Sequence, residues 1–358
     1  MLRPDFMIVT AEITGLKYVA KLGRVLEKFQ LSSLAQALSS QAAFLLDMDD
    51  GKTLAVSWWV SPKRTRSYPY ARVYDTLAFA GKRVTIIPVF KDEGGDGDRD
   101  FLQWDTVSLM SLLGVYVIIG YYKSARRNVK YENKITDQRF DAGHLKTQLG
   151  ELIHYQSDAL HWNLSQIDKI GELAGKAFSA YSEISRKLKV QMHSSSSARK
   201  RISSLVKGKQ VFMVLSRKLA EKAQGREIVT VQPKEKLAGA KAAITIRNYL
   251  GGYYFFTIDE ARKEDGKILL IEGKHTRGDH LPSLDDIKDG LLKMILYTNL
   301  KNVQVDSKET VSLPVLLLTT GENHKAGAYA SEPSFQQLKS EARTNGFQIL
   351  LNGKSVKL

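Results

Sequence analysis

Three charged residues with the chemistry of a hydrolytic metal site occur close together in the last third of the chain. Asp259 is followed, after 12 intervening residues, by Glu272, and Lys274 comes two positions later. Two carboxylates supply the hard oxygen ligands that Mg²⁺ prefers. An ammonium group beside them can stabilise phosphate charge, or orient or deprotonate an attacking water. These residue types at this spacing therefore indicate metal-dependent hydrolysis of a phosphate ester.

A β-hairpin is predicted to bring the three side chains together. The apolar segments 252–259 and 267–275 are typical of strands, and Asp265-Gly266 between them is a favoured pair for a type I′ turn. That turn places Asp259 directly opposite Glu272, and the two-residue period of a strand puts Lys274 on the same face. Facing carboxylates repel each other, and a divalent cation between them would remove that repulsion.

This pattern resembles the PD-(D/E)XK nuclease superfamily, the fold of most type II restriction endonucleases. The match consists of Asp259 followed by Glu272-Gly273-Lys274 at the end of an apolar strand, with a helix and a further strand after it. The resemblance implies that Asp259, Glu272 and the Gly273 carbonyl bind Mg²⁺, with Mn²⁺ as a substitute, and that Lys274 is catalytic. Ile258 stands where the motif often has proline, and the resemblance covers only residues 240–320.

Composition narrows the class of protein. The 358-residue chain has no cysteine, which excludes disulfides, thiolate zinc sites and a cysteine nucleophile. No apolar run is long enough to cross a membrane, and Asp5 and Glu12 interrupt the start where a signal peptide would be basic and then apolar. We therefore expect a cytoplasmic protein without a membrane partner. The absence of a GxxxxGK[ST] pattern indicates that ATP is not required.

The net charge of +15 is concentrated in one segment. Residues 186–250 hold 16 Lys and Arg but three acidic residues, which is typical either of a surface that binds a polyanion or of a solvated linker. The segment includes the polar stretch 193–201, predicted to be a linker or a flexible DNA-facing loop. The candidate DNA contacts, here and beside the hairpin, are Lys200, Arg201, Lys207, Lys209, His275 and Arg277.

The elements that position the hairpin predict an α/β protein. The C-terminal part, 194–358, is expected to be a nuclease domain with a restriction-endonuclease-like mixed sheet flanked by helices. An N-terminal α/β domain, 1–140, would serve recognition, dimerisation or both, and 141–193 would be a helical connector. The predicted strands are 53–60, 71–79, 83–90, 115–122, 252–259, 267–275, 311–319 and 347–351, and the predicted helices cover 101–113, 142–190, 283–300 and 335–343.

The sequence thus predicts a Mg²⁺-dependent, sequence-specific endonuclease acting on double-stranded DNA, of the type II restriction class and acting as a homodimer. Three alternatives stay open. A DNA-repair, junction-resolving or mobile-element nuclease would use the same residues on another DNA substrate. A non-catalytic DNA-binding protein would carry the charged hairpin as an ordinary surface feature, and an RNA-directed enzyme has no RNA-binding signature in its favour.

Overall fold

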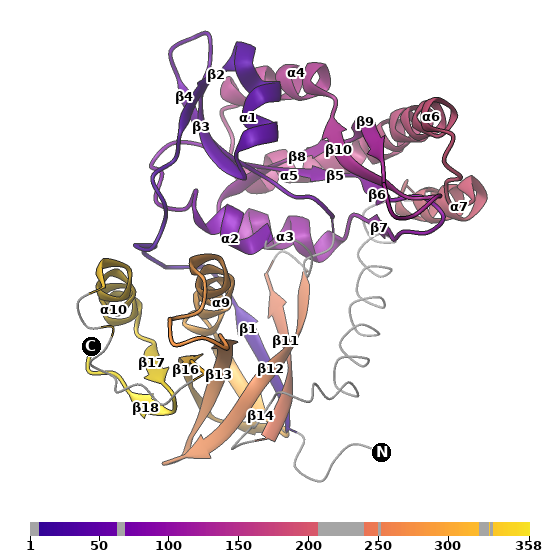
Figure 1. Cartoon of the computed structure of the whole chain (residues 1–358). Coiled ribbons are helices and arrows are strands. Elements are labelled where there is room, and N and C mark those ends of the chain that lie inside the picture. The colour runs from indigo at the N-terminus through magenta and orange to yellow at the C-terminus, as the bar shows by residue number, and fades with distance from the viewer. Residues whose placement is uncertain (1–6, 63–68, 207–239, 250–251, 322–328, 330–331) are drawn as a thin grey trace. The chain divides into compact units, whose positions relative to one another are not determined.

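The computed structural model describes residues 7–62, 69–206, 240–249, 252–321, 329 and 332–358 (Figure 1). The chain forms two compact units. Unit 1 combines Met1–Arg24 with Arg217–Leu358, and unit 2 is the intervening Val25–Ser216. Each unit has its own mixed arrangement of strands and helices, so the protein is α/β as predicted.

Unit 1 is built on a nine-stranded mixed sheet with the order β15-β14-β1-β11-β12-β13-β16-β17-β18. Strand β1 pairs in parallel with β11, and β13 pairs in parallel with β16, while β12 is antiparallel to both of its neighbours. The strands are β1 Met7–Ile13, β11 Ala240–Asn248, β12 Tyr253–Glu264, β13 Lys267–His275, β14 Lys301–Val305, β15 Lys308–Glu309, β16 Val311–Thr319, β17 Gln348–Leu351 and β18 Lys354–Ser355.

Among the described residues of unit 1, two helices flank this sheet, α9 (Leu284–Tyr297) and α10 (Pro333–Asn345). Helix α9 begins where the sequence predicts, because the side chain of Ser283 accepts a hydrogen bond from the Asp286 backbone N–H as its N-cap. Its buried residues pack on β13 and β16, and α10 packs on β17. The predicted hairpin, helix and strand are therefore present in this order, but two strands that were not predicted, β14 and β15, lie between α9 and β16 in the chain.

Unit 2 contains a five-stranded sheet, β2-β3-β4-β5-β8, and two separate two-stranded pairs, β6-β7 and β9-β10. The strands are β2 Lys28–Gln30, β3 Ala43–Asp47, β4 Thr53–Trp58, β5 Arg83–Pro88, β6 Phe90–Asp92, β7 Arg99–Phe101, β8 Val115–Gly120, β9 Tyr122–Arg127 and β10 Ile135–Phe140. The helices are the 3-10 helix η1 Leu31–Ser33, α1 Leu34–Ser40, α2 Pro69–Tyr74, α3 Trp104–Leu112, α4 Ala142–Ile153, α5 Ala159–Asp168, α6 Ile170–Leu188 and α7 Ser195–Val206.

Two local predictions in unit 2 are wrong. Residues 71–79 do not form a strand, because Pro69 begins a helical turn, α2, whose aromatic and β-branched residues are buried at helical spacing. The polar stretch 193–201 is not an open loop, since residues from Ser195 onward form α7. Ala198 and Ile202, four positions apart, are buried in α7, which packs on α6.

The predicted domain boundaries also need correction. Strand β1 lies in the sheet of unit 1, so residues 1–24 do not belong to an N-terminal domain. The predicted connector, 141–193, is part of unit 2, because α4 and α5 pack on β8 and α6 packs on β9. Among the described residues, no helix is both long and apolar enough to cross a membrane.

The charge of Asp141, the N-cap residue of α4, is expected to contribute to the stability of unit 2. The Asp141 carboxylate accepts hydrogen bonds from the His144 backbone N–H at 3.1 Å and the Tyr121 hydroxyl at 2.8 Å, and lies 2.9 Å from Lys123 Nζ. Burial alone would raise the pKa of Asp141, but these donors lower it to about 2. The carboxylate therefore stabilises the folded state above pH ~4, and this contribution is lost as the pH falls toward 2.

We expect Asp141→Asn, which keeps a capping oxygen but removes the charge, to lower the free energy of unfolding by about 1 kcal/mol at pH 7. Denaturant unfolding at pH 7 and pH 3 measures this, and the difference from the native protein should shrink at pH 3. A difference of equal size at both pH values would show that the charge is not its cause.

Candidate active site

The predicted hairpin forms with the predicted turn and register. Asp265 and Gly266 have φ values of 48° and 74°, the left-handed conformations that a type I′ turn requires. The ladder runs from the Glu264–Lys267 pair to the Glu260–Ile271 pair. It stops one position before Asp259 and Glu272, so these two residues stand where the paired part of the hairpin ends.

An irregularity of β12 coincides with this position. In the ladder with β11, Ala240 pairs with Ala261 but Ala242 pairs with Ile258, so β12 holds one extra residue here. This is a β-bulge at Asp259 and Glu260, and bulges re-aim side chains next to functional sites. Instead of a ladder pair with Glu272, Asp259 uses its side chain, whose Oδ2 accepts a hydrogen bond of 2.9 Å from the Gly273 backbone N–H.

Glu272 is the buried centre of the site. It is 2% exposed, and each of its oxygens lies beside a lysine: Lys293 Nζ donates to Oε2 at 2.6 Å, and Lys274 Nζ lies 3.0 Å from Oε1. Burial alone would raise the pKa of Glu272, but the two ammonium groups lower it. The carboxylate is therefore held ionised. In return, the carboxylates raise the pKa of Lys293 well above its usual value although burial opposes this.

Asp259 has the opposite electrostatic situation. Burial and the negative charge of Glu272 together raise the pKa of Asp259 to about 6. Among the described residues its Oδ1 atom has no hydrogen-bond donor. The site therefore holds one carboxylate that is fully neutralised and a second one whose charge is poorly compensated.

Helix α9 supplies the other half of the site. Asp289 Oδ2 accepts a hydrogen bond of 2.8 Å from Lys274 Nζ, so Lys274 bridges two carboxylates. Burial alone would lower the pKa of Lys274, but Glu272 and Asp289 raise it. Gly290 lets the helix approach closely, because a Cβ there would lie 2.9 Å from Leu316 Cδ1 and 3.0 Å from Lys274 Cε.

Sequence reasoning missed the α9 residues of this cluster. Asp289, Lys293 and Tyr297 recur every four residues and so lie on one stripe of the helix. The Tyr297 hydroxyl is buried without a hydrogen-bond partner among the described residues, and burial raises the pKa of this tyrosine. The i, i+4, i+8 spacing was visible in the sequence, but only the packing of α9 on β13 shows that this stripe faces Glu272.

The structure scatters the predicted DNA contacts. His275, the last residue of β13, and Arg277, just after the strand, are exposed, and His275 Nδ1 lies 2.9 Å from Thr319 Oγ1. Lys200 is exposed on α7, whereas Arg201 is partly buried with its guanidinium over the Phe101 ring at 5.0 Å. Lys207 and Lys209 lie outside the described residues. The site therefore gathers Asp259, Glu272 and Lys274, while those predicted DNA contacts that the structure describes are split between the two units.

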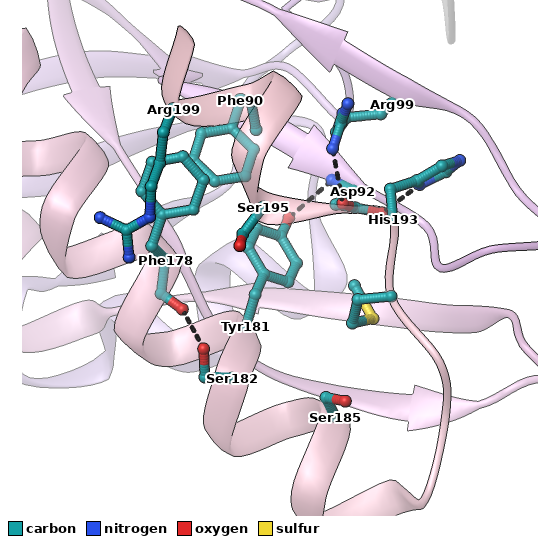
Figure 2. Close-up of a pocket in the computed structure, with 12 residues that line it drawn as sticks. Phe90, Asp92, Arg99, Phe178, Tyr181, Ser182, Ser185, His193, Ser195 and Arg199 are labelled. Atoms are coloured by element: carbon teal, nitrogen blue, oxygen red, sulfur yellow. Dashed lines mark hydrogen bonds and ion pairs between the residues drawn. The ribbon is translucent and has the colours of Figure 1, made fainter. Parts of the chain in front are cut away.

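A cavity of about 140 Å³ in unit 2 is a second place where charged side chains gather (Figure 2). Its polar groups contact one another: His193 Nδ1 lies 2.7 Å from Asp92 Oδ1, and the Tyr181 hydroxyl accepts from the Asp92 backbone N–H at 3.0 Å. Arg99 donates to the Ser194 carbonyl at 2.9 Å. These contacts hold the start of α7 against β6 and β7, and the single carboxylate of the cavity gives it no counterpart of the Asp259–Glu272 pair.

Comparisons with known proteins place the chain in no family: no protein-family model, no curated protein and no solved structure matches it.

Proposed function

We propose that the protein is a Mg²⁺-dependent endonuclease that hydrolyses phosphodiester bonds in double-stranded DNA. The observation that carries the proposal is the meeting of Asp259, Glu272 and Lys274 at the point where β12 and β13 cease to pair. Helix α9 after the hairpin and the parallel pairing of β13 with β16 support a restriction-endonuclease-like arrangement of unit 1, although β14 and β15 lie between α9 and β16 in the chain. Its most specific form is a type II restriction endonuclease.

The donor set fits a hard divalent cation. Asp259 and Glu272 would hold Mg²⁺ with the Gly273 carbonyl, and the poorly compensated charge of Asp259 supports this assignment. Among the described residues no group of three or more Asp, Glu, His or Cys is gathered for a metal, so water and a phosphate oxygen would complete the shell. When bound, Mg²⁺ supplies Lewis-acid polarisation of the phosphate and a more acidic water.

Lys274 and Lys293 have different roles in this proposal. Lys274 is partly exposed and bridges Glu272 and Asp289, so its ammonium group is held where it can bind a phosphate oxygen and stabilise negative charge as it develops. Lys293 contacts Glu272 from the helix side and keeps that carboxylate ionised and fixed in orientation. In this proposal Lys274 is the catalytic lysine and Lys293 is a positioning residue.

The substrate assignment rests on charge. The net charge of +15 favours a polyanion, and duplex DNA cut on both strands would suit a homodimer. The proposed enzyme needs no ATP and acts in the cytoplasm. DNA-repair, junction-resolving and mobile-element nucleases are variants of the same chemistry, and branched against linear DNA substrates would separate them.

The test is incubation of the purified protein with long unmodified duplex DNA in Mg²⁺, Mn²⁺ or EDTA. Lys274→Met is compared with Lys267→Met, an exposed lysine on the same strand. We expect discrete metal-dependent fragments from the native protein and from the Lys267 variant, and a rate about a hundredfold lower for Lys274→Met because a transition-state charge is lost. Equal rates for all three proteins would refute the assignment.

A non-catalytic DNA-binding protein is the second candidate, and one observation favours it. Both oxygens of Glu272 already contact lysines, so the cluster is largely self-neutralised. This alternative predicts salt-sensitive DNA binding without cleavage in Mg²⁺ or Mn²⁺. Intact DNA across several DNA sources and structures, with binding retained, would establish it in place of the nuclease.

Because helix α9 packs closely at Gly290, a side chain there should lower the cleavage rate by displacing Lys274. Gly290→Ala should stabilise the helical conformation of α9 by about 1 kcal/mol, but the new Cβ would lie too close to the side chains of Lys274 and Leu316. We expect cleavage to fall about tenfold or more without a matching loss of thermal stability, since small displacements at a reacting centre are costly. Gly175→Ala on α6, where a Cβ meets nothing within 4 Å, is the control and should cleave normally.

A further inference from the structure

The β9–β10 hairpin of unit 2, whose strands are labelled in Figure 1, is rich in positively charged residues. Residues 122–140 include six Lys and Arg but two acidic residues. Four of these cations have acidic partners: Lys123 with Asp141, Arg126 and Arg139 with Asp137, and Lys134 with Glu93. The remaining two, Arg127 and Lys130, make no side-chain hydrogen bond or ion pair with any described residue. The unpaired positive charge of the hairpin therefore lies at its tip, which is followed by one exposed acidic residue, Glu132.

The same tip exposes apolar side chains. Val129 is fully exposed, and Tyr131 is 55% exposed, although the rest of unit 2 buries most of its large apolar residues. An isolated exposed valine needs no explanation, but here an apolar and an aromatic side chain alternate with two unpaired cations over five residues. This combination suits a binding partner whose surface is negatively charged and can also accept a flat or apolar side chain.

The tip is held in a defined conformation. Asn128 Oδ1 accepts hydrogen bonds from the backbone N–H groups of Lys130 at 2.8 Å and Tyr131 at 3.2 Å. The loop is also fastened to the β6–β7 turn, because the Asn133 backbone N–H donates to Asp96 Oδ2 at 2.7 Å. The exposed side chains are thus presented on an ordered support, which lowers the entropy lost when a partner binds.

We propose that this tip, residues 127–131, is a contact element for duplex DNA. Arg127 and Lys130 bind backbone phosphates, and Val129 and Tyr131 lie in a groove against base or sugar edges. A two-stranded antiparallel ribbon has the dimensions to enter the major groove, and the local charge is complementary to phosphate. The inference deepens the proposed function and rests on it for the identity of the partner.

The experiment measures binding of the full-length protein to a labelled DNA duplex in EDTA, so that cleavage does not interfere, over a range of salt concentrations. Two double variants separate the contributions: Arg127→Gln with Lys130→Gln, and Val129→Ser with Tyr131→Ser. The matched control is Arg343→Gln on α10 with Lys354→Gln on β18, two exposed residues outside the basic segment 186–250 that form no side-chain ion pair with any described residue. Duplex RNA of the same sequence is a competing ligand.

We expect the charge variant to bind about tenfold more weakly and to reduce the slope of log Kd against log salt by about two, one for each lost phosphate contact. The apolar variant should bind several-fold more weakly with the slope unchanged. The control should bind like the native protein. A charge variant indistinguishable from the control, a preference for RNA, or no duplex binding by the native protein would each overturn the inference.

Failure here is distinguishable from failure of the nuclease proposal. If cleavage depends on Lys274 but DNA binding is unaffected by the tip variants, the nuclease proposal is supported and the inference about the tip is wrong. Binding that depends on the tip, without cleavage in any metal, would keep the inference and assign the chain to the DNA-binding alternative.

Discussion

Asp259→Asn is expected to reduce cleavage of duplex DNA at saturating Mg²⁺ by at least about a thousandfold, a larger loss than that expected for Lys274→Met. The substitution removes a charged metal ligand but keeps an oxygen that can accept the Gly273 N–H bond. The hairpin therefore has no structural reason to rearrange. Initial cleavage rates over a Mg²⁺ titration measure the effect, and a rate restored fully by more Mg²⁺ would show that only metal affinity had changed.

The same variant should be more stable than the native protein in EDTA. Burial and Glu272 raise the pKa of Asp259 to about 6, so the ionised form is unfavourable in the folded state. This penalty is present above pH 6 and disappears as the pH falls toward the unfolded pKa near 4. We expect a gain of about 2 kcal/mol at pH 8 that shrinks toward pH 4.

Asp265→Asn is the matched control for both measurements, since it is the same substitution in the same hairpin. Asparagine suits the type I′ turn as well as aspartate does, and Asp265 lies in the exposed turn. Its cleavage rate and stability should be native. If Asp259→Asn instead destabilised the protein at pH 8, the electrostatic account of the site would be wrong.

Lys293→Met is expected to lower the free energy of unfolding by about 2–3 kcal/mol. Lys293 donates at 2.6 Å to a carboxylate that is 2% exposed, and methionine keeps the aliphatic stem while removing the charge. Glu272 would retain only Lys274, 3.0 Å from its other oxygen, and a buried carboxylate with incomplete compensation is costly. Denaturant unfolding in EDTA gives the measurement.

A double-mutant cycle shows whether the effect belongs to the pair. Combining Lys293→Met with Glu272→Gln removes both charges, so the double variant should recover most of the stability lost by either single change. Additive losses would mean that Lys293 stabilises α9 through packing alone. The cycle concerns folding, so its result stands whether or not the protein cleaves DNA.

Features governed by local chemistry could be predicted from the sequence. The Asp265-Gly266 turn set the hairpin register, and Ser283 with its acidic first turn located the start of α9. Two residue types at fixed spacing on one strand, Glu272 and Lys274, were therefore placed together correctly. Each of these inferences used interactions that span only a few residues.

Features that depend on distant packing could not be predicted. The bulge at Asp259 is visible only in the pairing of β12 with β11, and the role of Lys293 only in the packing of α9 on β13. A strand was wrongly predicted for residues 71–79 because aromatic and β-branched side chains favour strands on average. In the structure, the buried contacts of α2 stabilise a helix instead. The predicted roles of Asp259, Glu272 and Lys274 in catalysis stay predictions.

The position of β1 has a consequence for how the protein is made. Its residues, Met7–Ile13, are synthesised long before β11, their parallel partner, which begins at Ala240. All of unit 2 is synthesised between these two strands, and it can fold while β1 is still unpaired. Completion of the sheet that carries Asp259 and Glu272 is therefore a late, long-range step, which should make unit 1 the slower unit to fold.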